Sequence, residues 1–244
     1  MKWQLILVGV VFITPAGAQD TDPISAERPG FSSSPFVLAP STLQIESGYQ
    51  YTREGGRIDF DDHTLPLLLF RAGLSERLEL QLGWAGYSWS DAGGNSVSGT
   101  NDASVGLKWQ VTDAGAAVPV ALFAGFSLPV GNDEFSSNEV DPTLGAFWSH
   151  SAGLDWFGTV VVSEASGDTS LSNAVGISLP VDNDKGAYVE YFGNYGGNAG
   201  PEHYLNGGLT YVPENDIQFD VHAGLGMNSR AADFFIGLGL AYRF

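Results

Sequence analysis

Apolar and polar residues alternate with a period of two along twelve stretches of this chain, most clearly in the last one. Successive side chains of a strand leave on opposite faces, so each stretch predicts a strand with one apolar wall and one small or polar wall. No segment is apolar over the about 20 residues that a membrane-spanning helix needs. The pattern therefore predicts an all-β fold, a transmembrane antiparallel up-and-down β-barrel of about twelve strands. In the last stretch the two parities are Phe234, Ile236, Leu238, Leu240, Tyr242 and Phe244 against Phe235, Gly237, Gly239, Ala241 and Arg243.

The first residues have the form of an export signal, with Lys2 as the positive start, a short apolar core and a small-residue cleavage site at 16–18. We expect residues 1–18 to be a cleaved signal peptide and the mature chain to begin at Gln19. Residues 19–41 are rich in Pro, Ser, Asp and Gly and lack the strand period, which predicts an irregular periplasmic arm. The alternative for this arm is a partial plug inside the pore. Residues 42–244 form the predicted barrel, in the outer membrane of a Gram-negative bacterium.

The charge of the chain excludes one large class of partner. The formal net charge is −18, and loss of Lys2 with the signal makes it −19. Nucleic acid requires a basic face, so no nucleic-acid partner is expected. The chain has no cysteine. A closed barrel needs no disulfide, because every strand already has two neighbours.

Connections between the expected strands alternate in length. Those after odd-numbered strands, such as 53–63, 89–101 and 129–141, are mostly long, whereas those after even-numbered strands, such as Ser75-Glu76, are short. Short periplasmic turns and longer outer loops are typical of bacterial outer-membrane barrels, and they predict that both termini lie on the periplasmic side. The expected strands are 42–52, 65–74, 78–84, 103–111, 118–128, 143–149, 154–163, 172–179, 187–193, 203–212, 217–225 and 234–244.

Aromatic residues on the apolar parity lie near strand ends, which suits the aromatic girdles at the two membrane interfaces. A soluble β-sandwich is the alternative, because aromatic residues favour strands in general. The sandwich does not explain the signal, the turn asymmetry and the Tyr-Arg-Phe end together. The predicted girdle residues are Tyr49, Trp84, Trp109, Trp148, Trp156, Tyr211, Tyr242 and Phe244.

The inner wall predicted by parity carries charges and aromatic rings. Its net acidic character predicts a pore that favours cations or neutral solutes over anions. Two alternatives stay open: the charges pair across strands, or the side chains simply fill a small barrel. The charged set is Glu46, Glu79, Asp102, Asp155, Glu190 and Asp220 with Arg71, Lys108 and Arg243, and the aromatic set is Phe123, Phe147, Phe157, Tyr188, Phe192, Tyr204 and Phe235.

Candidates for catalysis are few. Asp220 and His222 lie two residues apart on the predicted lumen face, so this pair could hold a proton or a metal. No third ligand and no activated serine stands at a telling spacing, and a polar lumen pair is the favoured interpretation. We therefore expect no enzyme activity, no catalytic or metal-binding residue and no cofactor.

Several motifs resemble one family. The segments 27–32 (ERPGFS) and 43–49 (LQIESGY) are similar to the opening of the outer-membrane β-barrel family assigned to transport in phenol meta-degradation. Leu65-Pro66 and 71–80 (RAGLSERLEL) continue the likeness, as do 106–108 (GLK) and 127–131 (SLPVG). Ala72 and Val130 depart from the commoner residues, and the later strands carry no matching motif. The resemblance implies an outer-membrane protein that passes small organic compounds, aromatic ones among them.

These observations predict an outer-membrane channel for passive uptake of small aromatic or hydrophobic compounds. A barrel hydrolase and a structural or surface-recognition barrel are the alternatives. Expected partners are outer-membrane lipid, the small organic solute and the barrel-assembly machinery, which would read Phe244, and the barrel is expected to be a monomer. The predicted solute path comprises Glu46, Arg71, Glu79, Asp102, Lys108, Phe123, Tyr188, Glu190, Phe192, Asp220, His222 and Arg243.

Overall fold

The structure is a computed structural model, and it describes residues 22–55, 59–196 and 200–244. The predicted signal peptide, residues 1–18, and the first residues of the predicted arm lie outside the described part. No helix within the described ranges is long and apolar enough to cross a membrane.

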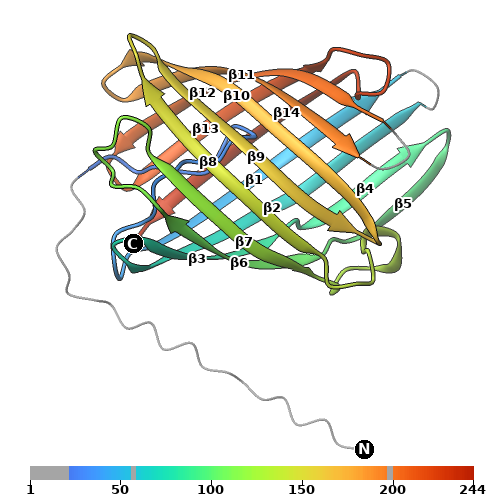
Figure 1. Ribbon diagram of the computed structural model, residues 1–244. Helices are drawn as coiled ribbons and strands as arrows, with labels where there is room; N and C mark the ends of the chain where they lie inside the picture. Colours follow the sequence, from blue (N-terminus) through green and yellow to red (C-terminus); the bar gives the residue numbers. More distant parts are fainter. Residues whose placement is uncertain (1–21, 56–58, 197–199) are drawn as a thin grey trace, which may run out of the picture.

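Twelve strands of the described chain form a closed antiparallel barrel (Figure 1). Each strand pairs with its neighbours along the chain, and β1 pairs with both β14 and β2, which closes the sheet. The expected fold is therefore confirmed. The barrel strands are β1 (Leu43–Glu54), β2 (Phe60–Ser75), β3 (Leu78–Trp84), β6 (Ala103–Gln110), β7 (Val120–Leu128), β8 (Pro142–Ser151), β9 (Asp155–Ala165), β10 (Asp168–Asp182), β11 (Lys185–Gly196), β12 (Glu202–Glu214), β13 (Ile217–Gly226) and β14 (Phe234–Arg243).

The two walls of the barrel carry opposite chemistry. Side chains of Glu79 and Lys108 on the inner wall are fully buried, whereas Leu238 on the outer wall is 57% exposed. A soluble protein buries its apolar side chains and exposes its charges, so this distribution is the reverse of a soluble one. It matches a barrel whose outer wall contacts lipid.

A hairpin of the same sheet, additional to the twelve barrel strands, forms the connection between β3 and β6. Its strands are β4 (Tyr87–Ala92) and β5 (Asn95–Thr100), which pair with each other. Strand β4 also pairs with the first residues of β2, from Phe60 to Leu65. The long connection predicted over 89–101 is therefore mostly strand. Gly93 and Gly94 have φ values of 58° and 86°, the left-handed conformation that a tight hairpin turn requires.

Connection lengths mostly follow the predicted asymmetry. At the end of the barrel called here the turn end, β2–β3, β10–β11 and β12–β13 join by two-residue turns at 76–77, 183–184 and 215–216. The opposite end, called the loop end, carries longer segments such as 129–141, which includes the short 3-10 turn η1 (Asp133–Phe135). Two connections differ: 111–119 at the turn end is long, and Ser166-Gly167 at the loop end is a tight turn with positive φ at both residues.

Exposed aromatic residues ring the turn end of the barrel. Trp109, Trp156, Tyr211 and Tyr242 lie at the turn-end termini of β6, β9, β12 and β14, and each is more than a third exposed. Rings with a polar edge prefer the headgroup level of a membrane. These positions agree with the predicted girdle, while Trp84, Trp148 and Tyr49 are half-buried.

Candidate functional site

The described part of the arm, residues 22–41, contacts the inner wall of the barrel (Figure 1). Its main-chain N–H groups donate to carboxylates that point inward from the strands. The N–H of Glu27 donates to Glu46 at 3.0 Å, that of Leu38 to Glu79 at 2.8 Å, and that of Ser32 to Glu190 at 3.1 Å. An irregular segment has no backbone ladder of its own, so these bonds supply the partners that buried N–H groups need.

Arg71 is the centre of the buried charge network. Its Nε lies 2.8 Å from Glu79, its Nη1 3.1 Å from Glu46, and its Nη2 3.1 Å from Glu27 of the arm. The Lys108 ammonium forms a second ion pair with Glu27. Buried charges are tolerated only when they are paired and hydrogen-bonded. The arm therefore completes a network whose members come from β1, β2, β3 and β6.

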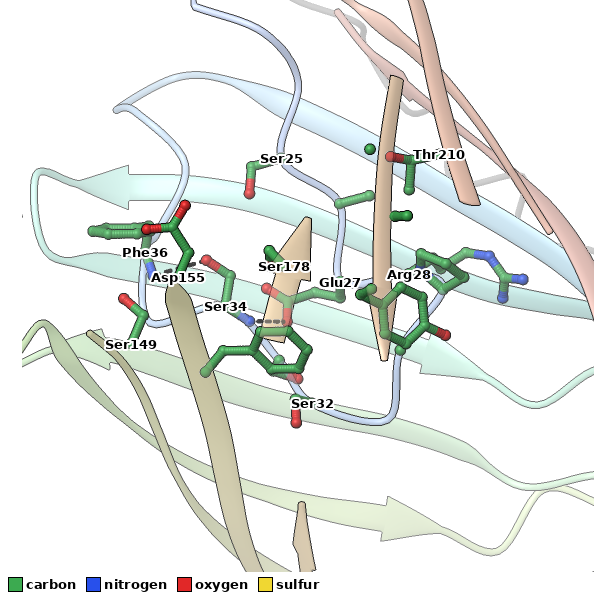
Figure 2. A pocket seen from close by; sticks show the side chains of 18 of the residues that line it. Ser25, Glu27, Arg28, Ser32, Ser34, Phe36, Ser149, Asp155, Ser178 and Thr210 are labelled. Atoms are coloured by element: carbon green, nitrogen blue, oxygen red, sulfur yellow. Dashed lines mark hydrogen bonds between the residues drawn. The ribbon is translucent and has the colours of Figure 1, made fainter. Parts of the chain in front are cut away.

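Glu27 is the acidic contribution of the arm to this network. Burial alone raises the pKa of Glu27, but the charges of Lys108 and Arg71 lower it, and the pKa ends below its ordinary value. Figure 2 also shows the N–H of Ser34 donating to Glu27, at 3.1 Å. The carboxylate is thus held in its charged form by both the barrel wall and the arm itself.

The guanidinium of Arg28 lies against the inner face of β1 and β14, at a pair of glycines. Gly48 and Gly239 are directly opposite in the register, and a Cβ at Gly239 would lie 2.2 Å from Nε of Arg28. This space lets the guanidinium reach Asp220 at 3.3 Å and the carbonyl oxygen of Leu238 at 3.2 Å. The absence of a side chain at these glycines therefore allows the ion pair between the arm and β13.

Aromatic rings join the arm to β11, β12 and β14. Phe31 stacks on Phe192 with ring centroids 4.6 Å apart, and Phe192 stacks on Tyr204 at 4.7 Å. Phe235 packs against both Phe192 and Tyr204 at about 6 Å. Gly224 leaves room for the ring of Phe235, because a Cβ there would meet it at 2.2 Å.

Cavities lie on both sides of the arm. The turn-end cavity (Figure 2), of about 450 Å³, is lined by arm residues 25–30 and 32–36 and by the turn-end parts of β8 to β12. The second cavity, called here the aromatic cavity, has about 280 Å³ and lies toward the loop end. Pro29 and Gly30 line both cavities, so this part of the arm separates them. Besides Pro29 and Gly30, the aromatic cavity is lined by the rings of Phe31, Phe192, Tyr204 and Phe235 and by the polar residues Gln50, Thr52, Asn194, Asn206 and His222.

The structure brings most of the residues of the predicted solute path to the inner wall. Phe123 is half-buried, and its ring packs beside Phe147 with centroids 6.4 Å apart. Arg243 lies at the turn end, where it donates to the carbonyl oxygens of Asp22 and Asn215. The residues of the predicted solute path that are buried are Glu46, Arg71, Glu79, Lys108, Tyr188, Glu190, Phe192, Asp220, His222 and Arg243.

Two acidic residues lie away from this cluster. Asp102 precedes β6 at the loop end, and its carboxylate accepts bonds from Gly131, Ser136 and Ser137 of the connection 129–141. This carboxylate contacts that loop and not the lumen charges, because Asp102 lies just before the strand and alternation along β6 does not place its side chain. Asp155 begins β9 at the turn end, where it lines the turn-end cavity.

Asp220 and His222 have separate surroundings. Asp220 pairs with Arg28, as described above, whereas Nδ1 of the buried His222 has no hydrogen-bond partner in the described structure. No group of three His, Cys, Asp or Glu residues placed to hold a metal occurs among the described residues. The proximity in sequence therefore does not produce an Asp–His hydrogen bond of the kind that orients a catalytic histidine.

The sequence interpretation missed the arm residues that complete the site. Glu27, Arg28 and Phe31 lie in an irregular segment, so no period indicated where they point. The signal for these residues is the motif 27–32 (ERPGFS), which indicates the family but not the direction of its side chains: two opposite charges and an aromatic ring surround Pro29-Gly30. Polar lumen partners such as Gln44 and Asn206 were likewise not singled out, although their parity is inward.

The closed barrel, its apolar outer wall and its charged lumen define an outer-membrane β-barrel. The chain belongs to the family described as "Putative MetA-pathway of phenol degradation", whose sequence pattern matches residues 26–244. The resemblance seen in the sequence is therefore confirmed. No curated protein matches the chain.

Several solved structures have a similar fold. An outer membrane channel from Pseudomonas putida F1 has a TM-score of 0.65 at 15% identity, over 89% of this chain and 99% of that one. The translocator domain of the autotransporter NalP from Neisseria meningitidis gives 0.56 at 12% identity, over 84% and 89%. The KdgM porin in complex with disordered oligogalacturonate gives 0.55 at 12% identity, over 82% and 99%. By these descriptions the similar structures are a channel, a porin and a translocator domain.

Proposed function

We propose that this protein is an outer-membrane channel for passive uptake of small organic compounds, aromatic or hydrophobic ones among them. The observation that carries the proposal is the pair of cavities on the two sides of Pro29-Gly30, within one closed barrel. A solute entering from the loop end would meet the aromatic cavity, pass the arm and reach the turn-end cavity. The channel and porin among the similar structures support this use of the fold.

The lining supports a small, uncharged solute. Aromatic rings provide apolar surface at the loop-end side, as described above. The central charges nearly balance and are mostly engaged with one another, so we expect neutral solutes and cations to pass better than anions. The carboxylates are Glu27, Glu46, Glu79, Glu190 and Asp220, and the cationic side chains are Arg28, Arg71, Lys108 and Arg243.

The proposal gives the arm the role of a partial plug that narrows the path. Liposome swelling tests both claims, with arabinose, phenylalanine and glutamate as solutes that cross a bare bilayer slowly. We expect wild-type protein to admit phenylalanine and to exclude glutamate. Deletion of residues 22–41 should raise the arabinose rate severalfold, because it opens the lumen. Deletion of the β4–β5 hairpin, residues 87–100, is the matched control and should leave the rates unchanged.

The same assay can contradict the proposal. Folded wild-type protein that admits no solute, even after deletion of the arm, is not a channel. An arm deletion that folds but keeps the wild-type rates would show that the arm does not narrow the path. Folding is checked by migration on a detergent gel with and without boiling, since a closed barrel resists detergent until it is heated.

We propose no enzymatic activity for the lumen. Asp220, the partner that His222 would need for general-base chemistry, is engaged by Arg28 at 3.3 Å. Replacement of His222 by Ala should therefore remove no hydrolytic activity toward lipid or ester substrates. An ester hydrolysis rate that falls in this variant would support the hydrolase alternative.

The proposal also covers the oligomeric state and the barrel-assembly machinery. We propose that the protein is a monomer, since the sheet closes within a single chain. Phe244 is 71% exposed, although its N–H donates to Leu43 and its ring packs edge-on against Tyr242, so most of this residue is accessible to the barrel-assembly machinery. Replacement of Phe244 by Ser should lower the amount of barrel assembled in cells. The molecular mass of the detergent-solubilised barrel should stay that of a monomer.

A further inference from the structure

We propose that the turn end of the lumen contains a binding site for a small organic ammonium ion, centred on Asp155. The inference rests on the channel function proposed above and assigns a ligand class to the last part of the path. It depends on three features: a passage between two cavities, a carboxylate in that passage without an opposite charge beside it, and aromatic rings that line the same passage.

Asp155 lies where two cavities meet. Besides the turn-end cavity, a further cavity of about 450 Å³, called here the rim cavity, lies between the connection 111–119 and the turn-end parts of β8 to β10. Five residues line both cavities and therefore form the passage between them. They are Phe36 of the arm, Ser149 of β8, Asp155 and Phe157 of β9, and Ser178 of β10.

The strand register places these side chains within reach of one small ligand. Asp155 is directly opposite Ser178 of β10. On the other side of β9, Phe157 is directly opposite Ser149 of β8. Opposite residues have Cβ atoms about 5 Å apart, and residues two apart on one face of a strand are about 7 Å apart. Figure 2 shows Phe36 of the arm at the same end of the turn-end cavity as Asp155 and Ser149.

The carboxylate of Asp155 is available to a cationic ligand. It accepts a hydrogen bond from the hydroxyl of Ser151 at 2.6 Å, and it forms no ion pair in the described part of the chain. The other two charged side chains of the turn-end cavity, Glu27 and Arg28, are engaged in the ion pairs described above. Among the described residues that line the rim cavity there is no Lys or Arg. The passage therefore carries one uncompensated negative charge, which attracts cations and repels anions.

The aromatic rings favour an organic ammonium over a metal ion. Because Asp155 is exposed, its charge alone would hold a cation only weakly. Phe36 and Phe157 lie in the passage, and Tyr188 packs against Phe157 with ring centroids 6.3 Å apart. Ring faces attract alkylammonium groups through cation–π interactions. Divalent metal ions instead require several oxygen ligands, and no group of three His, Cys, Asp or Glu placed to hold a metal occurs among the described residues.

Saturation-transfer NMR on the full-length protein in dodecyl maltoside micelles tests the site, with choline and 3,3-dimethyl-1-butanol as matched probes. The two molecules have the same shape and the same hydroxyl group, but only choline is charged. Signals from empty micelles are subtracted. We expect saturable one-site binding of choline, about tenfold tighter than the alcohol, because the ion pair and the cation–π contacts both contribute.

Two variants separate these contributions. Asp155→Asn removes the charge and keeps an acceptor for Ser151, so the affinity for choline should fall about fivefold. Phe36→Leu keeps an apolar side chain and removes the ring, so the affinity should fall about threefold. Asp168→Asn is the matched control, since Asp168 is exposed at the loop-end start of β10 and lines neither cavity. Its affinity for choline should equal that of the wild-type protein.

Equal affinity of the two probes for wild-type protein would overturn the inference, and this comparison needs no variant. So would unchanged choline affinity in Asp155→Asn or Phe36→Leu protein that migrates as a folded barrel. Displacement of choline by an equal concentration of potassium chloride would reduce the site to a counterion position and would also reject it. The channel proposal fails separately. Permeation in the swelling assay without choline binding rejects the site and keeps the channel, whereas choline binding without permeation of any solute keeps the site and rejects the channel.

Discussion

Arg71 is the residue on which the buried charges of the lumen depend most. Three carboxylates lie within 3.1 Å of its guanidinium, and all four side chains are nearly inaccessible to solvent. The planar fork of arginine can satisfy several carboxylates at once, which a lysine cannot do. The residue therefore stabilises both the barrel wall and the position of the arm.

Replacement of Arg71 by Met should lower the free energy of unfolding by about 3–5 kcal/mol, because it leaves buried carboxylates unpaired. Urea unfolding in phospholipid vesicles, followed by tryptophan fluorescence, measures the change. Arg77→Met is the matched control: its pair with Asp113 is half to four-fifths exposed, so the cost should stay below about 1 kcal/mol. Equal effects of the two substitutions would show that burial does not set the strength of the network.

Gly239 decides whether Arg28 can lie against the barrel wall. In Gly239→Ala a Cβ would overlap the guanidinium, so we expect Arg28 to leave Asp220 and the conductance of single channels to rise severalfold. Gly115→Ala is the control, since nothing lies within 4 Å of the new methyl group there. An unchanged conductance in folded Gly239→Ala protein would mean that the ion pair does not hold the arm.

Among the connecting elements, the segment 129–141 makes several bonds to the carboxylate of Asp102. Burial raises the pKa of Asp102, but the N–H of Gly131 and the hydroxyl of Ser136 lower it, and the pKa ends below its ordinary value. A group whose pKa is lower in the folded state stabilises that state above its ordinary pKa of about 4. This stabilisation is lost as the pH falls through the lower, folded value. We therefore expect the loop to keep its contacts at neutral pH and to lose them only in strong acid.

Asp102→Asn removes the charge at all pH values, and charge-assisted bonds are the stronger ones. Cleavage of the loop by a glutamate-specific protease, at Glu134 or Glu139, should become roughly tenfold faster at neutral pH. Asp133→Asn, in the exposed turn η1, should not change the cleavage rate. A loop that is equally protected in both variants would place its restraint elsewhere, for example in the bonds of Asn132 to Thr100.

At the scale of the whole molecule, stability in the membrane depends on which wall a residue occupies. Leu238 lies at the middle of β14 on the outer wall, opposite Val221 of β13. A charge at this depth must leave water for hydrocarbon. Leu238→Arg should therefore cost about 2–4 kcal/mol in vesicles, whereas Tyr242→Arg, near the turn-end interface, should cost at most about 1 kcal/mol. Similar costs at both positions would argue against a membrane centred on Leu238.

The strands were predictable because their information is local. Parity alone placed Leu238 outside and Phe235 inside, and all twelve barrel strands lie where alternation predicted them. The hairpin β4–β5 and the tight turn Ser166-Gly167 were not predicted. Their signals were short: Tyr87 and Trp89 alternate with serines before Gly93-Gly94. A tight turn depends on the backbone conformation of one or two residues. A single glycine permits the positive φ that such a turn needs but does not require it, so it predicts the turn only weakly.

Sequence by itself determined the architecture of this protein, since a period of two repeated along the chain has one membrane solution, the closed barrel. The course of the arm was decided only by the tertiary structure. Whether residues 22–41 stay outside or enter the lumen depends on Glu46, Arg71, Glu79, Lys108 and Asp220, which belong to five strands and meet only when the sheet closes. Local sequence patterns cannot predict these contacts. Alternation along a strand shows which side chains point inward, but not which side chains of other strands they contact.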